Sequence, residues 1–300
     1  MLLQLASLIT AIVGALAVPI AHNAPQPPLN LRGGAEELSE LTAQSVFLVD
    51  VASGAILHTQ NADEVRPLAS ITKLMTAMVL LDHIKDSPSG KGLSFDRQIT
   101  FETRDRRNGD ITRLIPGEEI TVRDAWKIML VGSSNDAAAF LTRTILGSEE
   151  AAVATMNARA KELGLRRLKF TDPTGLDVGN VGTAREVSAL ARVSLQYPEI
   201  REAVLQTSFQ FAPKGKPARK VQATNQLLYR FRQGDIQLLG GKTGHIEASG
   251  YNLVFAVGNH AQELVGVILG APDNEARFAE MKILLTWGFK RVPASQSLGD

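Results

Sequence analysis

The stretch Glu64-Val65-Arg66-Pro67-Leu68-Ala69-Ser70-Ile71-Thr72-Lys73-Leu74-Met75-Thr76-Ala77-Met78-Val79-Leu80-Leu81 changes character at its centre. An extended segment bounded by proline gives way to an apolar run, so we expect a helix that opens at Ser70 and runs to about Ile84. Ser70 and Lys73 lie three residues apart and share one helix face, where the amine can take the hydroxyl proton. This spacing predicts a serine nucleophile with a lysine base. By itself, Ser-x-x-Lys is a weak pattern that more usually indicates a helix cap followed by a solvated lysine.

Composition narrows the chemistry that this serine and lysine could serve. The chain has 300 residues, of which 44% are hydrophobic and 21% charged, which is typical of one large domain or two closely packed ones. Its net charge is +1, so no nucleic-acid partner is expected. The absence of cysteine excludes disulfides and thiolate chemistry, and the five histidines lack the spacing of zinc helices. We therefore expect no metal and no cofactor, and a hydroxyl as the nucleophile.

The first 24 residues read as an export signal. Residues 1–20 are almost uninterruptedly apolar, Ala15-Leu16-Ala17 is a small-residue cleavage site, and a proline-rich segment follows. Because no Lys or Arg precedes the apolar run, an uncleaved anchor remains an alternative. In either case the rest of the chain is predicted to be exported, to the periplasm or to the outer face of the cytoplasmic membrane. No other segment is long and apolar enough to cross a bilayer.

Strand patterns enclose a helical middle. After a linker over residues 25–43, residues 45–50 and 55–58 predict a hairpin, and residues 238–241, 251–257 and 264–269 predict strands before a helix over 274–289. Strands at both ends that enclose helices imply one shared antiparallel sheet, with sheet parts at about 44–69 and 235–290. Between them, residues 86–234 predict an all-helical subdomain, with helices ending at Gly132, over 136–146 and 149–163, and opening at a Thr183/Glu186 capping box. Residues 291–300 form a tail.

Two further motifs stand in a fixed order after the first. Ser133-Ser134-Asn135 falls in the tight connection between two predicted helices, and Lys242-Thr243-Gly244 follows Gly240-Gly241 at the end of a predicted strand. Taken singly, the first is an ordinary helix N-cap and the second a strand edge with a turn glycine. Chance rarely supplies all three in this order on a helix start, an inter-helix loop and a strand edge.

With these three motifs the chain resembles the penicillin-recognising serine acyltransferases, which carry Ser-x-x-Lys, Ser-x-Asn and Lys-Thr-Gly. Residues 65–77, 133–139, 170–176 and 241–245 are more specifically similar to the low-molecular-mass D-alanyl-D-alanine carboxypeptidase and endopeptidase family of peptidase S11 type. The resemblance covers residues 44–290. It implies an α/β (α+β) fold of the transpeptidase and β-lactamase type, in which helices flank a five-stranded antiparallel sheet.

The resemblance also assigns roles within a catalytic site. Ser70 would attack the carbonyl between two D-alanines of a peptidoglycan stem peptide, and Lys73 would be the base, kept partly neutral by burial and by the nearby Lys242. Ser133 would pass a proton to the leaving amine, and β-lactams would inhibit covalently. The groups that would hold Lys73 and the substrate, or supply the backbone oxyanion hole, are Asn135, Lys242, Thr243, Gly244 and His245.

Three alternatives remain open at this stage. A serine β-lactamase would need a deacylating glutamate between the second and third motifs, and residues 172–180 contain none. A scaffold with little turnover would act through peptidoglycan-enzyme partners. Within the family, the chain end soon after the last helix leaves no C-terminal β domain, which favours the soluble endopeptidase branch in cell-wall remodelling. We expect the His245 ring to form a cleft wall, Arg104, Arg106 and Arg107 to form a solvated face, and residues 172–177 to form the cleft floor.

Overall fold

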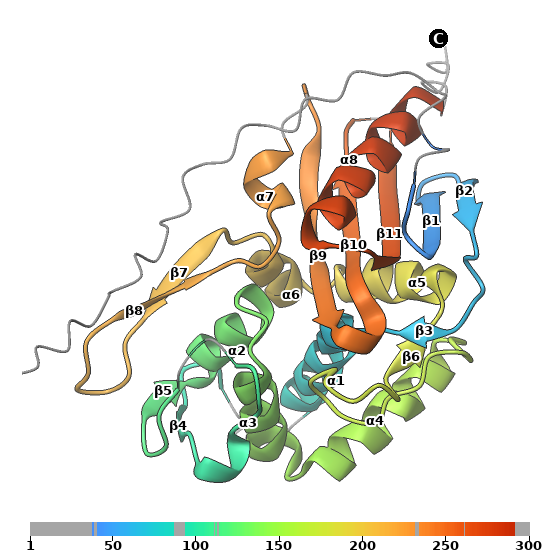
Figure 1. Ribbon diagram of the computed structural model, residues 1–300. Helices are drawn as coiled ribbons and strands as arrows, with labels where there is room; N and C mark the ends of the chain where they lie inside the picture. The colour runs from blue at the N-terminus through green and yellow to red at the C-terminus, as the bar shows by residue number, and fades with distance from the viewer. Residues whose placement is uncertain are drawn as a thin grey trace, which may run out of the picture.

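The computed structural model describes residue 38 and residues 41–86, 94–110, 112, 114–231, 234–260 and 262–291 (Figure 1). The predicted signal peptide and all but the first residue of the predicted tail lie outside this range. The last residues of the predicted linker are anchored, because the backbone N–H groups of Thr42 and Ala43 donate to the Glu280 carboxylate at 3.0 and 3.1 Å. Glu280 belongs to the C-terminal helix α8 (Asn274–Arg291). The described fold thus begins slightly before Gln44.

One antiparallel sheet joins the two ends of the chain, as the sequence predicts. Its strands run in the order β2-β1-β11-β10-β9, and each neighbouring pair is antiparallel (Figure 1). The strands are β1 (Ser45–Asp50), β2 (Ile56–Gln60), β9 (Gln237–Ile246), β10 (Gly250–Gly258) and β11 (Glu263–Ala271). Strand β9 is one edge of the sheet and continues through Lys242-Thr243-Gly244, where the sequence had placed the end of a strand.

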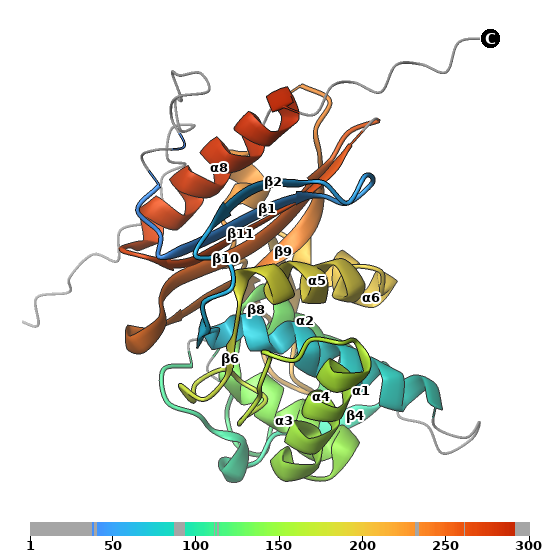
Figure 2. The same cartoon turned by 90° about the vertical axis from the view of Figure 1, so that its right-hand side faces the viewer.

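The sheet is buried on both faces because helices cover both. Figure 2 shows α8 on one face and α5 (Ala184–Ser194) on the other, above the helical subdomain. Successive side chains of a strand point to opposite faces. In β10, Leu253 and Phe255 accordingly pack into the core beneath α8, whereas Val254 and Ala256 pack into the core shared with the helical subdomain.

Helix α1 (Lys73–Asp86) is the centre of the helical subdomain. Its residues from Lys73 to Leu81 are buried, and it packs against α3, α4 and α5. A helical segment that is buried on all sides is mostly apolar, which explains the apolar run over residues 74–81. The other helices are α2 (Val122–Val131), α3 (Asn135–Leu146), α4 (Glu149–Glu162), α6 (Pro198–Val204) and α7 (Leu227–Arg230).

The subdomain is mainly helical where the sequence predicts only helices. Two-stranded ribbons join β4 to β5 and β7 to β8 within it, and a third pairs β3 with β6 beside the sheet. The short length of these strands explains why period-two patterning does not reveal them. Their bounds are β3 (Arg66–Pro67), β6 (Val181–Gly182), β4 (Gln98–Thr100), β5 (Glu119–Thr121), β7 (Ser208–Phe211) and β8 (Arg219–Gln222).

Two local predictions are corrected. The helix does not open at Ser70 as an α-helix, because residues Ala69–Thr72 form a 3₁₀ turn and α1 begins at Lys73. The capping box at α5 is only half formed: the Thr183 hydroxyl accepts from the Glu186 N–H at 3.2 Å, but the Glu186 carboxylate accepts from the Arg167 N–H instead. The Glu186 carboxylate therefore binds the Arg167 N–H, from another segment, and not the Thr183 N–H of its own helix.

Candidate active site

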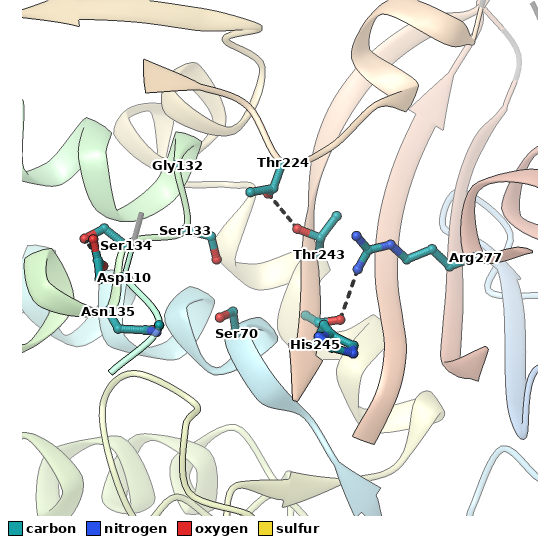
Figure 3. Close-up of a pocket in the computed structure, with 12 residues that line it drawn as sticks. Ser70, Asp110, Gly132, Ser133, Ser134, Asn135, Thr224, Thr243, His245 and Arg277 are labelled. Carbon is teal, nitrogen blue, oxygen red and sulfur yellow. Dashed lines mark hydrogen bonds between the residues drawn. The ribbon is translucent and has the colours of Figure 1, made fainter. Parts of the chain in front are cut away.

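The three sequence motifs meet at one cavity of about 200 Å³ between the sheet edge and the helical subdomain. Figure 3 shows the Ser70 and Ser133 side chains facing the same space, with Thr243 and His245 on the β9 side. The cavity is lined by Ser70, Gly109, Asp110, Gly132, Ser133, Ser134, Asn135, Thr224, Thr243, Gly244, His245 and Arg277. The site residues predicted from sequence lie in this lining or, like Lys73 and Lys242, are bonded to it.

Ser70 owes its position to a tight turn. Ala69 adopts a left-handed conformation, with φ of 50°, which is uncommon for a residue other than glycine. The 3₁₀ turn that follows places side chains three residues apart directly above one another. The Lys73 Nζ atom accordingly lies 2.9 Å from the Ser70 Oγ atom. The predicted hydroxyl and amine pair is therefore formed, by a 3₁₀ turn where an α-helix was expected.

The other contacts of Lys73 orient its amine. Its Nζ donates to the Asn135 Oδ1 atom at 2.7 Å and to the Thr174 carbonyl at 2.6 Å. Both partners can only accept, so in a neutral amine they would take both N–H groups. The remaining lone pair would then point at Ser70, the one partner of the three with a proton to give. The arrangement prepares Lys73 to accept the Ser70 proton.

Burial sets the protonation state of Lys73. The side chain is fully buried, and desolvation lowers its pKa to about 7, while the Asp172 and Asp110 carboxylates act in the opposite direction. Asp172 stays ionised despite its own burial, because its oxygens accept five hydrogen bonds from Thr174, Gly175, Asp177 and Asn180, and its pKa is lowered. Near neutral pH both forms of Lys73 are therefore populated, as a general base requires.

Ser133 and Lys242 form a second hydroxyl and amine pair across the cavity. Ser133 has a left-handed backbone, with φ of 59°, in the three-residue connection from α2 to α3, which turns its hydroxyl into the cavity. Lys242 Nζ donates to Ser133 Oγ at 2.7 Å and to the Thr243 carbonyl at 3.0 Å. Burial lowers the pKa of Lys242 well below its usual value, and the charges of Lys73 and Arg277 lower it further. Since two ammonium groups repel each other, the site favours a single charge on this lysine pair.

Two glycines bring the cavity walls onto the turn of Ser70. A Cβ atom at Gly175 would lie 2.1 Å from the Ala69 carbonyl oxygen, and one at Gly244 would lie 2.6 Å from the Leu68 carbonyl oxygen. Neither position can therefore carry a side chain without displacing the backbone. Gly244 thereby holds the edge strand β9 against the Ser70 turn, and Gly175 holds the loop whose Thr174 carbonyl binds Lys73.

Arg277, on α8, was not predicted from the sequence as a site residue. Its Nη1 atom donates to the Gly244 and Asn252 carbonyls at 3.1 and 3.3 Å, and burial lowers its pKa to about 10. A charged residue on the same helix face as the buried Met281 and Leu284 is the signal that could have revealed it. Arg277 adds a fixed positive charge to the β9 side of the cavity (Figure 3).

The structure places His245 in the cavity lining, whereas residues 172–177, expected as the cleft floor, lie outside that lining and contact Lys73 and Ala69 from behind it. The His245 ring stacks on Tyr251 at 4.0 Å between centroids, as a wall of the cleft. None of the three arginines lines the cavity: Arg104 pairs with Glu102 at 2.8 Å, Arg106 reaches the Leu114 carbonyl at 3.5 Å, and Arg107 pairs with Glu149. Within the described ranges no group of three or more acidic or histidine side chains is placed to hold a metal ion.

A five-stranded antiparallel sheet packed on a helical subdomain, with these three motifs at the junction, defines the class of penicillin-recognising serine enzymes. The family model for D-alanyl-D-alanine carboxypeptidases, peptidase S11, matches residues 32–273. The chain belongs to this family, and both the predicted family and the predicted fold are confirmed.

Individual relatives agree with this assignment. The chain is 34% identical over 274 residues to the D-alanyl-D-alanine endopeptidase of Escherichia coli K12, covering 91% of this chain and 84% of that protein. It is 33% identical to the D-alanyl-D-alanine carboxypeptidase DacC of the same organism, covering 85% of this chain but 63% of that protein. The crystal structure of the D-alanyl-D-alanine carboxypeptidase of Mycobacterium tuberculosis H37Rv superposes with a TM-score of 0.74 at 25% identity, over 90% of this chain and 96% of that one.

Proposed function

We propose that the protein is a serine-type D-Ala-D-Ala peptidase that acts on peptidoglycan stem peptides through an acyl-enzyme on Ser70. The observation that carries this proposal is the buried Lys73 amine, 2.9 Å from the Ser70 hydroxyl and oriented toward it by two obligate acceptors. Membership of the D-alanyl-D-alanine carboxypeptidase family supports the substrate class. The protein is accordingly expected to bind penicillin covalently.

Acylation uses both lysines. Neutral Lys73 takes the Ser70 proton while Oγ attacks the carbonyl carbon between the two D-alanines. The C–N bond breaks as Ser133 gives its proton to the leaving amine and Lys242 replaces the proton of Ser133 across their 2.7 Å contact. The pair of lysines keeps one charge throughout, since the proton that Lys73 gains equals the proton that Lys242 gives up. Backbone N–H groups of Ser70 and His245 form the proposed oxyanion hole, which contributes about 3 kcal/mol per donor.

Deacylation reverses these transfers. Water attacks the ester, Ser133 and Lys242 take up its proton, and Lys73 returns its proton to the Ser70 oxygen as the ester breaks. Asp172 is no substitute for a lactamase glutamate, because backbone and side-chain donors already occupy both of its oxygens. A bound penicillin would block the approach of water, so we expect a long-lived adduct and do not favour the β-lactamase alternative.

The β9 side of the cavity orients the substrate. As a sheet edge, β9 can pair with an extended peptide as an additional strand. Thr243 and the positive charge of Arg277 would hold the carboxylate next to the scissile bond, a group that only accepts hydrogen bonds. Asn135 would bind Lys73 through Oδ1 and the substrate backbone through its amide nitrogen. Gly244 leaves the strand close enough to Ser70 for these contacts to act together.

Within the family we propose endopeptidase activity on cross-links, in an exported protein of the periplasm. Similarity to the Escherichia coli endopeptidase over 84% of its length supports this branch. No helix in the described part of the chain is long and apolar enough to span a membrane. A role in cell-wall organisation and shape, and contacts with other peptidoglycan enzymes, follow as proposals from the substrate.

To test this proposal, purified peptidoglycan is incubated with the wild-type protein and, separately, with the Ser70→Ala variant, and the products are compared. We expect the wild type to convert cross-linked dimers into monomers and to form a covalent fluorescent-penicillin adduct, and Ser70→Ala to do neither. Release of D-alanine from pentapeptides instead of monomers from dimers would assign carboxypeptidase activity. Penicillin labelling without either product would favour the scaffold alternative, and identical behaviour of Ser70→Ala would refute the proposed nucleophile.

A further inference from the structure

Thr224 joins the two walls of the cavity but belongs to none of the three motifs. It follows β8 by two residues, and its backbone N–H donates to the Val131 carbonyl at the end of α2, 3.2 Å away. Its hydroxyl lies 2.6 Å from the Thr243 hydroxyl on β9 (Figure 3). The ribbon before it also braces the Ser133 turn, since a Cβ atom at Gly132 would lie 2.6 Å from Val221 Cγ1. Thr224 therefore links the α2 side of the cavity, which carries Ser133, to the β9 side, which carries Thr243.

The short contact between the two hydroxyls has two possible directions. A single proton fills the space between two oxygens at 2.6 Å, so only one threonine donates in this bond. If Thr243 donates to Thr224, its proton is not available to a ligand in the cavity. If Thr224 donates to Thr243, the Thr243 proton is free to point into the cavity.

A carboxylate in the cavity selects the second direction. Carboxylate oxygens only accept, so the chain runs from Thr224 through Thr243 to the ligand, and each bond polarises the next. Arg277 contributes positive charge, but its Nη1 N–H groups are already donated to the Gly244 and Asn252 carbonyls. A neutral amide presents donors as well as an acceptor and gains less from a chain with one fixed direction.

We propose that Thr224 is a positioning residue that fixes the direction of the Thr243 hydroxyl and so determines the preference for substrates with a free carboxylate next to the scissile bond. The inference rests on the proposed function, because it needs acylation of Ser70 as its readout. It extends that function by assigning carboxylate selectivity to a residue outside the three motifs. The structural role of Thr224 can be separated from the role of its hydroxyl, because the contact with Val131 is made by the Thr224 backbone.

The test compares Thr224→Val with Thr224→Ser. Valine keeps the shape and removes the hydroxyl, whereas serine keeps the hydroxyl. The readout is the rate of Ser70 acylation, followed by mass spectrometry, with benzylpenicillin and with its neutral carboxamide. We expect Thr224→Val to lower the rate with benzylpenicillin about fivefold, the scale of one lost hydrogen bond between neutral hydroxyls, and to change the carboxamide rate less than about twofold. Thr224→Ser should keep the wild-type preference.

A double variant separates positioning from general damage. If Thr224 acts through Thr243, then Thr243→Val should lose the preference by itself, and adding Thr224→Val should cost little more. Equal losses with both ligands, or additive losses in the double variant, would refute the inference. Thermal unfolding checks the fold, and Thr224→Ala serves if valine does not fold. A wild-type protein that benzylpenicillin never acylates would instead refute the proposed function, and this inference with it.

Discussion

The two hydroxyl and amine pairs of the cavity are chemically alike but are built differently. In each, a fully buried lysine contacts a serine on a strained turn, Lys73 with Ser70 at 2.9 Å and Lys242 with Ser133 at 2.7 Å. The first pair is local, three residues apart on a 3₁₀ turn. The second spans 109 residues and two different layers of the fold. The first pair therefore depends on one helix start, and the second depends on the docking of the sheet against the helical subdomain.

Their electrostatic surroundings differ as well. Two carboxylates, Asp172 and Asp110, oppose the effect of burial on Lys73, whereas two cations, Lys73 and Arg277, add to the effect of burial on Lys242. Lys73 is thereby held near its titration point, and Lys242 is driven to give up its proton when Lys73 gains one. In the proposed mechanism the two lysines accordingly have opposite roles, base and acid, and the neighbouring charges account for that difference.

The largest expected effect comes from making either lysine unable to release a proton. Arginine keeps the positive charge but does not deprotonate in proteins. We expect Lys73→Arg to lower the rate of acylation by penicillin on the order of 10³, as Lys73→Met does, because the base is lost. Lys242→Arg should likewise be no better than Lys242→Met, because Lys242 must pass its proton to Ser133. The measurement is stopped-flow acylation of all four variants.

Thermal unfolding of the four variants separates chemical loss from misfolding. The proposed acid role of Lys242 would be contradicted if Lys242→Arg kept most of the activity while Lys242→Met was inactive. That result would reduce Lys242 to a fixed charge and move the acid function elsewhere. A Lys73→Arg protein faster than Lys73→Met would equally remove Lys73 as the base.

A smaller effect is expected in the pH dependence of acylation. Because the pKa of Lys73 is lowered to about 7, the neutral base is present above that pH, and kcat/KM should rise through pH 7. The Asp110 carboxylate raises the pKa of Lys73, so Asp110→Asn should move the rising limb to lower pH. The profile is measured as the second-order rate of penicillin acylation between pH 5 and 9, a range that brackets the pKa.

Thr112→Val is the matched control for Asp110→Asn. It removes the Thr112 hydroxyl that donates to Asp110, but it keeps the carboxylate charge. We expect its rising limb to stay near the wild-type position even if the loop around residue 110 loosens. An Asp110→Asn profile that moves to higher pH, or one that Thr112→Val reproduces, would show that Asp110 does not tune Lys73 by its charge.

Short stretches of sequence revealed the local parts of this site, whereas long-range contacts such as Lys73 with Asn135 were expected only from the family resemblance. The spacing of Ser70 and Lys73 and the position of Ser133 between two helices follow from short stretches, so they could be read directly. The Thr174 carbonyl that binds Lys73 is a backbone atom and has no residue-type signature. Arg277 reaches the cavity from the C-terminal helix, and such contacts require the tertiary arrangement.

Secondary structure shows the same division between local and tertiary causes. The sheet strands were predicted from short apolar β-rich runs, and they share one sheet as expected. The 3₁₀ turn at Ser70 escaped prediction because the helical pattern continues through it. In the predicted Thr183/Glu186 capping box the Glu186 carboxylate does not bind the Thr183 N–H, because it accepts from the Arg167 N–H of a separate loop. Where the hydrogen-bond partner comes from a distant segment, as for Glu186, the local sequence pattern was not sufficient to predict the contact.

The smallest expected effect separates the two serine turns by the sign of a stability change. Ser133 has a left-handed backbone, whereas Ser70 follows the left-handed Ala69 and itself lies in a right-handed turn. Glycine tolerates the left-handed conformation, so Ser133→Gly should be more stable than Ser133→Ala by about 1 kcal/mol. At Ser70 the order should reverse, with Ser70→Gly less stable than Ser70→Ala by about 0.5–1 kcal/mol. Urea unfolding of the four variants, each of which lacks one of the two site hydroxyls, measures both differences. If the stability difference between the glycine and alanine variants has the same sign at both positions, the backbones of the two serine turns are equally strained. The difference between the two pairs would then be limited to their side-chain contacts.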